Sequence, residues 1–265
     1  MINVGWGSKQ TQFHGSLGKS AAQAAPSRLP IGNPLDHELP IISWRGDGAF
    51  FCISSSDPYS ASSSKPGKKR RQMRIYARSP VSLSATSEPI HGLEGAISWR
   101  PAGNLIAAVQ GFGWDGGADG EGEDRGRKDV VFLERNGLQH GQFRLREDSR
   151  YKGKEALLKQ GNIGWSVIEL AYNSDSEILA VWVRQEEQDV GESTLPRRTI
   201  FRSKLTHNSI PKVQLWTMNN YHYYLKQEIC VPHSSSNRFT SMTWHQENPR
   251  ILYLTGGGTC QSIFH

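Results

Sequence analysis

A run of basic residues is the densest charge cluster in the sequence and the first feature that could do chemistry. The stretch 65–71 reads KPGKKRR and lies in a Ser-rich segment. Clustered cations attract a nucleic-acid backbone without reading its bases, so this stretch could bind RNA phosphates. The candidate contacts are Lys68, Lys69, Arg70 and Arg71. A merely solvated basic loop is the competing interpretation, and a nuclear-import signal is another.

A second candidate is an aromatic cluster at 221–224, which reads YHYY and is followed by Lys226. The rings could stack on RNA bases while the Lys226 ammonium meets a phosphate. Two other interpretations stay open. The cluster could begin a buried strand, or it could form a protein–protein contact, where aromatic residues are enriched.

Other residue patterns give little support for catalysis or metal binding. The nine histidines show no H-x-x-x-H spacing, and the three cysteines form no C-x-x-C pair. The stretch 111–116 contains G-x-G-x-x-G but lacks the strand–helix context of a phosphate-binding loop. The acidic stretch 116–124 lacks the glutamate that closes a calcium loop. We therefore predict that the chain is not an enzyme and holds no metal or cofactor.

Composition limits the class of protein. The 265 residues include 27 Gly and 13 Pro, which favours many turns over long helices. No apolar run approaches the roughly 20 residues that span a bilayer, and the N-terminus does not resemble a secretion signal. Unpaired, widely spaced cysteines fit a reducing compartment. We expect no membrane association and a cytoplasmic location, with the nucleus as an alternative. The net charge of +6 permits acidic partners without requiring them.

An internal repeat organises the rest of the chain. The pattern at 42–54 (ISWRGDGAFFCIS) recurs at 97–109, and weaker copies follow at 169–181 and 242–254. Each copy predicts a strand that ends at an aromatic residue, a tight turn, and a second strand. Further strands are expected after the first three hairpins, at 73–78, 130–135 and 213–217. The sequence therefore predicts an all-β fold built of repeated blades.

The repeats are spaced more widely than the roughly 40 to 50 residues of a lean propeller blade. Insertions between the second and third strands explain the difference, at 55–71, 111–128 and 184–212. Their equivalent positions would place all three on one face. We assign residues 1–40 to a partial strand and a flexible linker, and residues 41–265 to a partial propeller.

The repeated aromatic position has two possible roles. It is occupied by Trp44, Trp99, Tyr172 and Trp244. These rings could pack between adjacent blades, where large apolar side chains bury the most surface. Alternatively they could form a stacking platform for bases. Identical placement in every repeat favours packing.

Four segments resemble a known family. They are 4–13 (VGWGSKQTQF), 42–47 (ISWRGD), 132–141 (FLERNGLQHG) and 215–228 (LWTMNNYHYYLKQE). Together they resemble the first β-propeller of the largest subunit of the Elongator complex. The likeness runs from about Val4 to about Gly256, with the insertions excluded. Tyr172, where this family usually has Trp, departs from the pattern.

The resemblance implies an incomplete WD-repeat β-propeller with about three blades and part of a fourth. It implies that the chain begins after the first strands and that its ending at 261–265 departs from the family, whose helical repeats and dimerisation region are absent. The full-length family members are homodimers. They act as scaffolds in an assembly that modifies the wobble uridine of transfer RNA, while another subunit catalyses the reaction.

The implied partners are the other Elongator subunits, including the catalytic one, with transfer RNA contacted indirectly or weakly. An RNA-binding propeller module that contacts transfer RNA through its basic loops is the alternative function. An independent hydrolase that uses the propeller channel is a third, which no Ser, Cys or His constellation supports.

Overall fold

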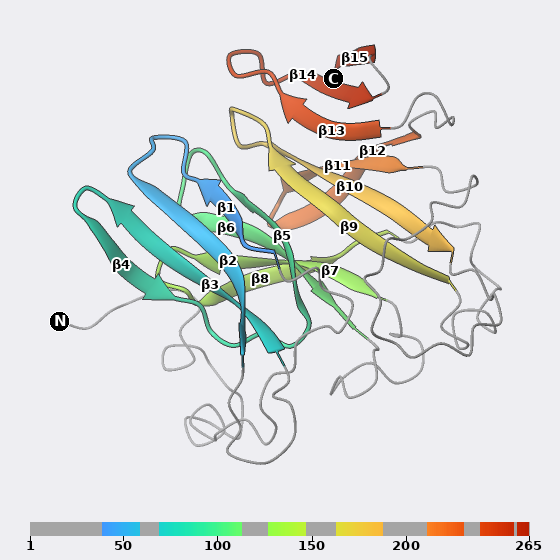
Figure 1. Cartoon of the computed structure of the whole chain (residues 1–265). Coiled ribbons are helices and arrows are strands. Elements are labelled where there is room, and N and C mark those ends of the chain that lie inside the picture. Colours follow the sequence, from blue (N-terminus) through green and yellow to red (C-terminus); the bar gives the residue numbers. More distant parts are fainter. Residues whose placement is uncertain are drawn as a thin grey trace. The chain divides into compact units, whose positions relative to one another are not determined.

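The structure is a computed structural model in which seven stretches of the chain are described: residues 39–58, 69–112, 127–146, 163–187, 211–230, 239–256 and 259–264. These residues form strands, turns and connecting segments (Figure 1). The predicted partial strand and linker at 1–38 lie outside the described residues. Among the described residues there is no helix long and apolar enough to cross a membrane.

The chain divides into two compact units. The first comprises residues 1–145 with 174–176, and the second comprises residues 146–173 with 177–265. Each unit contains two antiparallel sheets.

The first unit is built from two four-stranded sheets in which each strand pairs with the next along the chain. The first sheet consists of β1 (Ile41–Trp44), β2 (Phe50–Pro58), β3 (Lys69–Arg78) and β4 (Val81–Thr86). The second consists of β5 (Leu93–Trp99), β6 (Leu105–Gly111), β7 (Lys128–Glu134) and β8 (Gln139–Arg144).

The second unit repeats this plan. Its four-stranded sheet consists of β9 (Ile163–Tyr172), β10 (Ile178–Glu187), β11 (Lys212–Asn219) and β12 (His222–Cys230). Its three-stranded sheet consists of β13 (Phe239–Trp244), β14 (Ile251–Gly256) and β15 (Thr259–Phe264). Such up-and-down sheets are the blades of a propeller. The prediction of an all-β fold with three blades and part of a fourth is confirmed.

Burial follows strand position within a blade. Residues 71–76 of β3 alternate between buried and half-buried, as expected for a strand with one covered face. In contrast, β6 and β7 are buried almost throughout, and β8 on the edge alternates between half-buried and exposed. In this sheet β5, β6 and β7 therefore carry the apolar sequence signal, whereas the last edge strand, β8, does not.

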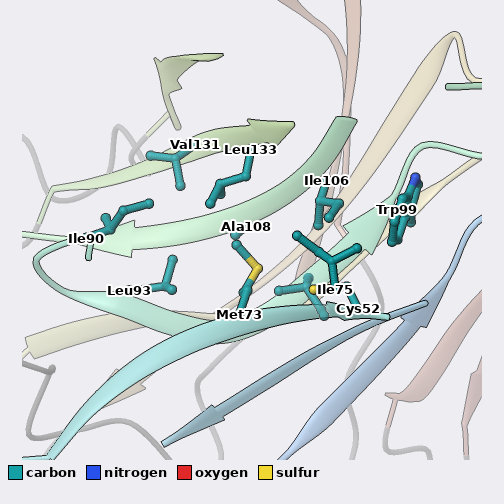
Figure 2. Packing of buried hydrophobic residues seen from close by; sticks show 11 residues of the cluster. Cys52, Met73, Ile75, Ile90, Leu93, Trp99, Ile106, Ala108, Val131 and Leu133 are labelled. Carbon is teal, nitrogen blue, oxygen red and sulfur yellow. The ribbon is translucent and has the colours of Figure 1, made fainter. Parts of the chain in front are cut away.

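The core of the first unit lies between its two sheets. Figure 2 shows apolar side chains of β2 and β3 meeting those of β5, β6 and β7. The buried members are Cys52, Met73, Ile75, Ile90, Leu93, Ile97, Trp99, Ile106, Ala108, Val131 and Leu133. Trp99 is the largest of the side chains that are almost completely buried.

The core of the second unit is built in the same way from its own two sheets. It comprises Ile178, Ala180, Trp182, Val213, Leu215, Phe239, Met242, Trp244, Leu252 and Leu254. The rings of Trp182 and Phe239 lie 4.2 Å apart between centroids. Trp244 Nε1 donates a hydrogen bond of 3.0 Å to the carbonyl of Ala171 on β9. The ring at the repeated aromatic position thus joins two blades, as predicted.

Two sequence-based assignments differ from the structure. The sequence predicts three strands per blade, but each of the first three sheets has a fourth edge strand, namely β4, β8 and β12. The insertion predicted at 55–71 is shorter, because β2 continues to Pro58 and β3 begins at Lys69, with Ser56 pairing Arg71. Backbone hydrogen bonds can pair two strands whatever the polarity of their side chains. The Ser-rich end of β2 and the basic start of β3 therefore lack the apolar pattern from which a strand is predicted.

A partly buried carboxyl on β9 predicts a pH effect. Burial raises the pKa of Glu169, while a hydrogen bond from the Met242 backbone amide opposes this shift. The folded protein therefore holds this proton more tightly than the unfolded chain, and stability falls as pH rises from the unfolded to the folded pKa. We expect Glu169→Gln to stabilise the chain at pH 7 and to have little effect well below pH 4. Urea unfolding at the two pH values measures this, and equal effects at both would contradict it.

Candidate interaction surfaces

The predicted basic cluster does not form one exposed group. Lys68 lies outside the described residues, and Lys69 is the first residue of β3. Arg70 is half-buried, whereas Arg71 is only 3% exposed. Arg71 occupies the covered face of a strand and not a solvated loop, so its burial disfavours a contact with an RNA phosphate, and the RNA contact of this segment stays a prediction.

Arg71 joins three segments of the first unit instead. Its Nη1 donates hydrogen bonds of 3.0 Å to the carbonyl of Leu39 and 3.0 Å to the carbonyl of Ser54. The same nitrogen lies 3.3 Å from Ser54 Oγ. A Cβ at Gly95 of β5 would lie 3.4 Å from Arg71 Nη2. The guanidinium thus fixes the start of β1 against β2 and β5.

We expect Arg71→Met to lower the free energy of unfolding by about 2 to 3 kcal/mol, because buried carbonyls would lose a charged donor. Arg70→Met is the matched control. It should cost less than about 1 kcal/mol, as partly exposed charged side chains do. Urea unfolding of both variants measures the difference. Equal losses would mean that the burial of Arg71 has no energetic consequence.

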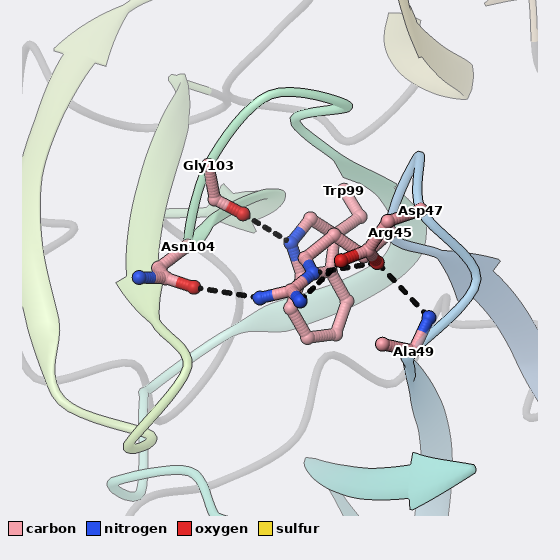
Figure 3. Close-up of polar contacts among 6 residues, drawn as sticks. All are labelled: Arg45, Asp47, Ala49, Trp99, Gly103 and Asn104. Carbon is pink, nitrogen blue, oxygen red and sulfur yellow. Dashed lines mark hydrogen bonds and ion pairs between the residues drawn. The ribbon is translucent and has the colours of Figure 1, made fainter.

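A polar cluster lies where the β1–β2 and β5–β6 turns meet (Figure 3). Arg45 Nε donates to Asp47 Oδ1 at 2.8 Å, and its Nη2 forms an ion pair with Asp47 Oδ2. Arg45 Nη1 also donates to Asn104 Oδ1 at 3.2 Å, which links the two hairpins. Asp47 accepts a further hydrogen bond of 2.9 Å from the backbone N–H of Ala49.

This cluster stabilises a turn and is poorly suited to catalysis. The Arg45 guanidinium and the Ala49 amide lower the pKa of Asp47 to about 2, so its carboxylate stays ionised and neutralises Arg45. The guanidiniums of Arg45 and Arg135 each lie 4.6 Å from the centre of the Phe50 ring. Cation–π contacts of this kind orient both arginines. Sequence reasoning missed this cluster because its members come from different repeats.

An exposed aromatic row crosses the first sheet on the face opposite its core. Trp44, Phe51, Tyr76 and Leu83 are successive cross-strand partners on β1, β2, β3 and β4. The ring centroids of Trp44 and Phe51 are 4.7 Å apart, and those of Phe51 and Tyr76 are 5.2 Å apart. Trp44 is 51% exposed and Leu83 is 55% exposed. We call this set the Trp44 row.

The predicted core role is confirmed at three repeats and wrong at Trp44. Trp99, Tyr172 and Trp244 are all buried, whereas half of the Trp44 surface is open. Trp99 and Trp244 pack against the sheet that precedes their own blade within the same unit. No preceding sheet covers Trp44 among the described residues, which explains its exposure. A contiguous apolar row of this kind is typical of a surface that another sheet or protein covers.

We expect the isolated chain to associate with itself through the Trp44 row, because an apolar face that no described residue covers, together with open strand edges, favours association. Replacing both Trp44 and Tyr76 with threonine should shift it towards the monomer while retaining strand propensity. Light scattering across a concentration series measures this. A wild-type chain that is monodisperse and monomeric at every concentration would contradict the expectation.

The aromatic cluster at 221–224 forms the end of the β11–β12 hairpin. Tyr221 is 95% exposed, Tyr224 is 51% exposed and Met218 beside them is 42% exposed. The cluster does begin a strand, β12, but the expectation of a buried strand is wrong, because β12 is the exposed edge of its sheet. The RNA and protein-contact interpretations both remain predictions.

The remaining chemical candidates offer no assembled site among the described residues. Gly111 and Phe112 are described, and the rest of the glycine motif lies outside the described residues. His, Cys, Asp and Glu side chains do not gather in groups of three or more that could hold a metal in the described part. Burial raises the pKa of the Cys52 thiol to about 12, so it stays protonated and is a poor nucleophile.

Comparisons with known proteins show which family this sequence is similar to. A family model described as "ELP1 first N-terminal beta-propeller" matches residues 1–247. Elongator complex protein 1 of Oryctolagus cuniculus is 36% identical over 260 residues, which cover 96% of this chain and 15% of the relative. The Schizosaccharomyces pombe protein of the same name is 31% identical over 268 residues, covering 99% of this chain and 16% of the relative.

The chain therefore spans less than a fifth of these curated relatives. Among solved structures, an acylaminoacyl peptidase aligns at 12% identity and a TM-score of 0.46, over 85% of this chain and 32% of the peptidase chain. That likeness is too weak to support a conclusion. The identity to the Elongator proteins extends over almost the whole chain, including the strands that form both units.

Proposed function

This chain belongs to the family of the first β-propeller of Elongator complex protein 1, and on that basis we propose that it is part of a non-catalytic scaffold subunit of the Elongator complex. The observation that carries the proposal is the family match over residues 1–247. In this proposal the whole protein acts in the modification of the wobble uridine of transfer RNA, and another subunit performs the chemistry.

Two features of the described residues support a scaffold role. The groups that could do chemistry are already engaged: Arg45 neutralises Asp47, and the Cys52 thiol is buried and protonated. In contrast, the Trp44 row presents aromatic rings in contact with one another on a sheet face that no described residue covers. Apolar and aromatic surface of this kind suits protein contacts better than it suits turnover of a small substrate.

The alternative function, an RNA-binding module, loses part of its sequence support. Arg71 is buried in the first unit, which leaves Lys68, Lys69 and Arg70 of the four proposed contacts. Fewer accessible cations mean fewer neutralised phosphates and weaker RNA binding. We propose that any contact of this segment with transfer RNA is auxiliary. We also propose that the protein is mainly cytoplasmic.

Affinity purification of the tagged full-length protein, with and without ribonuclease, tests the proposal. A scaffold held by protein contacts should retain the other Elongator subunits, including the catalytic one, after the RNA is digested. Quantitative mass spectrometry of the eluates measures this retention. Loss of the subunits on digestion would instead assign the protein to the RNA-binding class, and their absence from both eluates would overturn membership of the complex.

A further inference from the structure

The turn between β11 and β12 has an unusual residue for its conformation. Asn219 and His222 form the last cross-strand pair, so Asn220 and Tyr221 make a two-residue turn. Both have positive φ, 48° for Asn220 and 64° for Tyr221. Turns of this kind strongly favour Asn-Gly, because glycine adopts positive φ without steric cost. Asparagine at the first position fits this preference, whereas tyrosine at the second is an outlier.

Packing within the chain does not compensate for this strain. The side chain of Tyr221 is 95% exposed, so its ring buries almost no surface within the second unit. A bulky residue that is both strained and exposed does not stabilise the fold. Glycine would stabilise the same turn better. Strained residues of this kind occur at sites of recognition, where the strain orients a contacting group.

The surroundings of Tyr221 indicate what it contacts. Met218 and Tyr224 are the other exposed large hydrophobic side chains of the hairpin, at 42% and 51% exposure. From Val213 to Leu225 the sequence contains no Lys, Arg, Asp or Glu. Binding of nucleic acid needs several cations that neutralise phosphates, whereas the described hairpin offers one exposed cation, Lys226, because Lys212 is paired with Glu228. An uncharged, protruding group with an aromatic end is typical of the residues that anchor protein interfaces.

We propose that Tyr221 is an anchor residue that inserts into an apolar pocket on a partner protein, with its phenol O–H donating to an acceptor in that pocket. The partner is another subunit of the assembly, so this inference rests on the proposed function. The rigid two-residue turn holds the ring away from the sheet before binding, which lowers the entropy lost on association. Met218 and Tyr224 form the surrounding apolar rim.

Three variants of the full-length protein test the proposal. Y221G removes the ring and relieves the strain, Y221A removes the ring and keeps the strain, and N220G changes the other turn position while keeping the ring. Each tagged variant is purified, washed at high salt, and its retained Elongator subunits are quantified by mass spectrometry. Amide hydrogen exchange in the β11–β12 hairpin reports local stability in the same samples.

We expect retention of one subunit to fall at least ten-fold in both Y221G and Y221A and to match wild type in N220G. Hairpin exchange should be slower by about five-fold in Y221G, because relief of strain stabilises the turn. Wild-type retention in both Tyr221 variants would overturn the proposal. Loss of transfer RNA with all subunits retained would overturn it too and assign the turn to RNA.

A photo-crosslinking phenylalanine analogue at position 221 separates this inference from the proposed function. Cross-links to one partner protein are expected. If wild type retains the Elongator subunits but the analogue cross-links only to RNA or to nothing, this inference fails and the proposed function stands. If wild type retains no Elongator subunit, the proposed function fails, and this inference fails with it because it names a subunit of that assembly as the partner.

Discussion

Replacing Trp99 with alanine is expected to lower the free energy of unfolding by about 3 to 5 kcal/mol, the range found when large aromatic core residues are truncated. The ring is only 2% exposed and lies in the core between the two sheets of the first unit. Its Nε1 also donates to the carbonyl of Gly103 at 3.1 Å. The substitution therefore removes both packing and a hydrogen bond. Urea unfolding followed by circular dichroism measures the loss.

Trp44→Ala is the matched control, because it removes the same side chain from the repeat-equivalent position. Trp44 is half exposed and contacts Phe51 at the surface. Its replacement should cost about 1 kcal/mol or less, in line with the loss of one aromatic contact. A Trp99→Ala variant as stable as Trp44→Ala would show that the core lies elsewhere.

Substitution of Gly137 by alanine should destabilise the first unit by about 2 to 4 kcal/mol. The residue has a φ of 87°, which costs an L-amino acid about 1 to 2 kcal/mol. A Cβ there would also lie 2.4 Å from the carbonyl oxygen of Thr86, so backbone must move. The Gly137 carbonyl accepts a 2.8 Å hydrogen bond from Glu88, and that movement would weaken it.

Gly141→Ala on β8 serves as the control for Gly137→Ala. A Cβ at Gly141 would meet nothing within 4 Å. Because alanine also restricts the unfolded chain, this variant should be neutral or stabilised by up to about 1 kcal/mol. The two variants are compared by the same urea titration. Similar stability of both would contradict the close approach of the β7–β8 turn to Thr86.

The sequence predicted the blades because the first strands of each blade have distinctive patterns. The hairpin at 97–109 combines β-branched and aromatic residues with a Gly-containing turn, and the structure forms β5 and β6 there. The edge strand β4 was not predicted, because its residues are mostly exposed and need no apolar pattern. An edge strand is held to its sheet by backbone hydrogen bonds, and these bonds leave no periodic pattern in the side chains.

The candidate surfaces were harder to predict than the fold. Arg71 belongs to a basic run whose composition favours a solvated loop, and only the register with Ser56 reveals that its side chain is buried. Similarly, Trp44 repeats the Trp99 sequence pattern but lacks a covering sheet among the described residues. The strain at Tyr221 comes from backbone geometry, which residue type alone does not specify. The exposure of a side chain depends on which elements pack against it, and strain depends on the backbone conformation. Local sequence alone specifies neither.

Mass spectrometry of the wobble nucleosides of transfer RNA tests the proposed scaffold role most directly. Deleting the gene for the full-length protein should remove the carboxymethyl-type modified uridine, and the wild-type gene should restore it. Trp99→Ala, which damages the core of the first unit, should restore it only in part, in proportion to the amount of folded protein. Unchanged levels of the modified nucleoside after deletion would contradict the account.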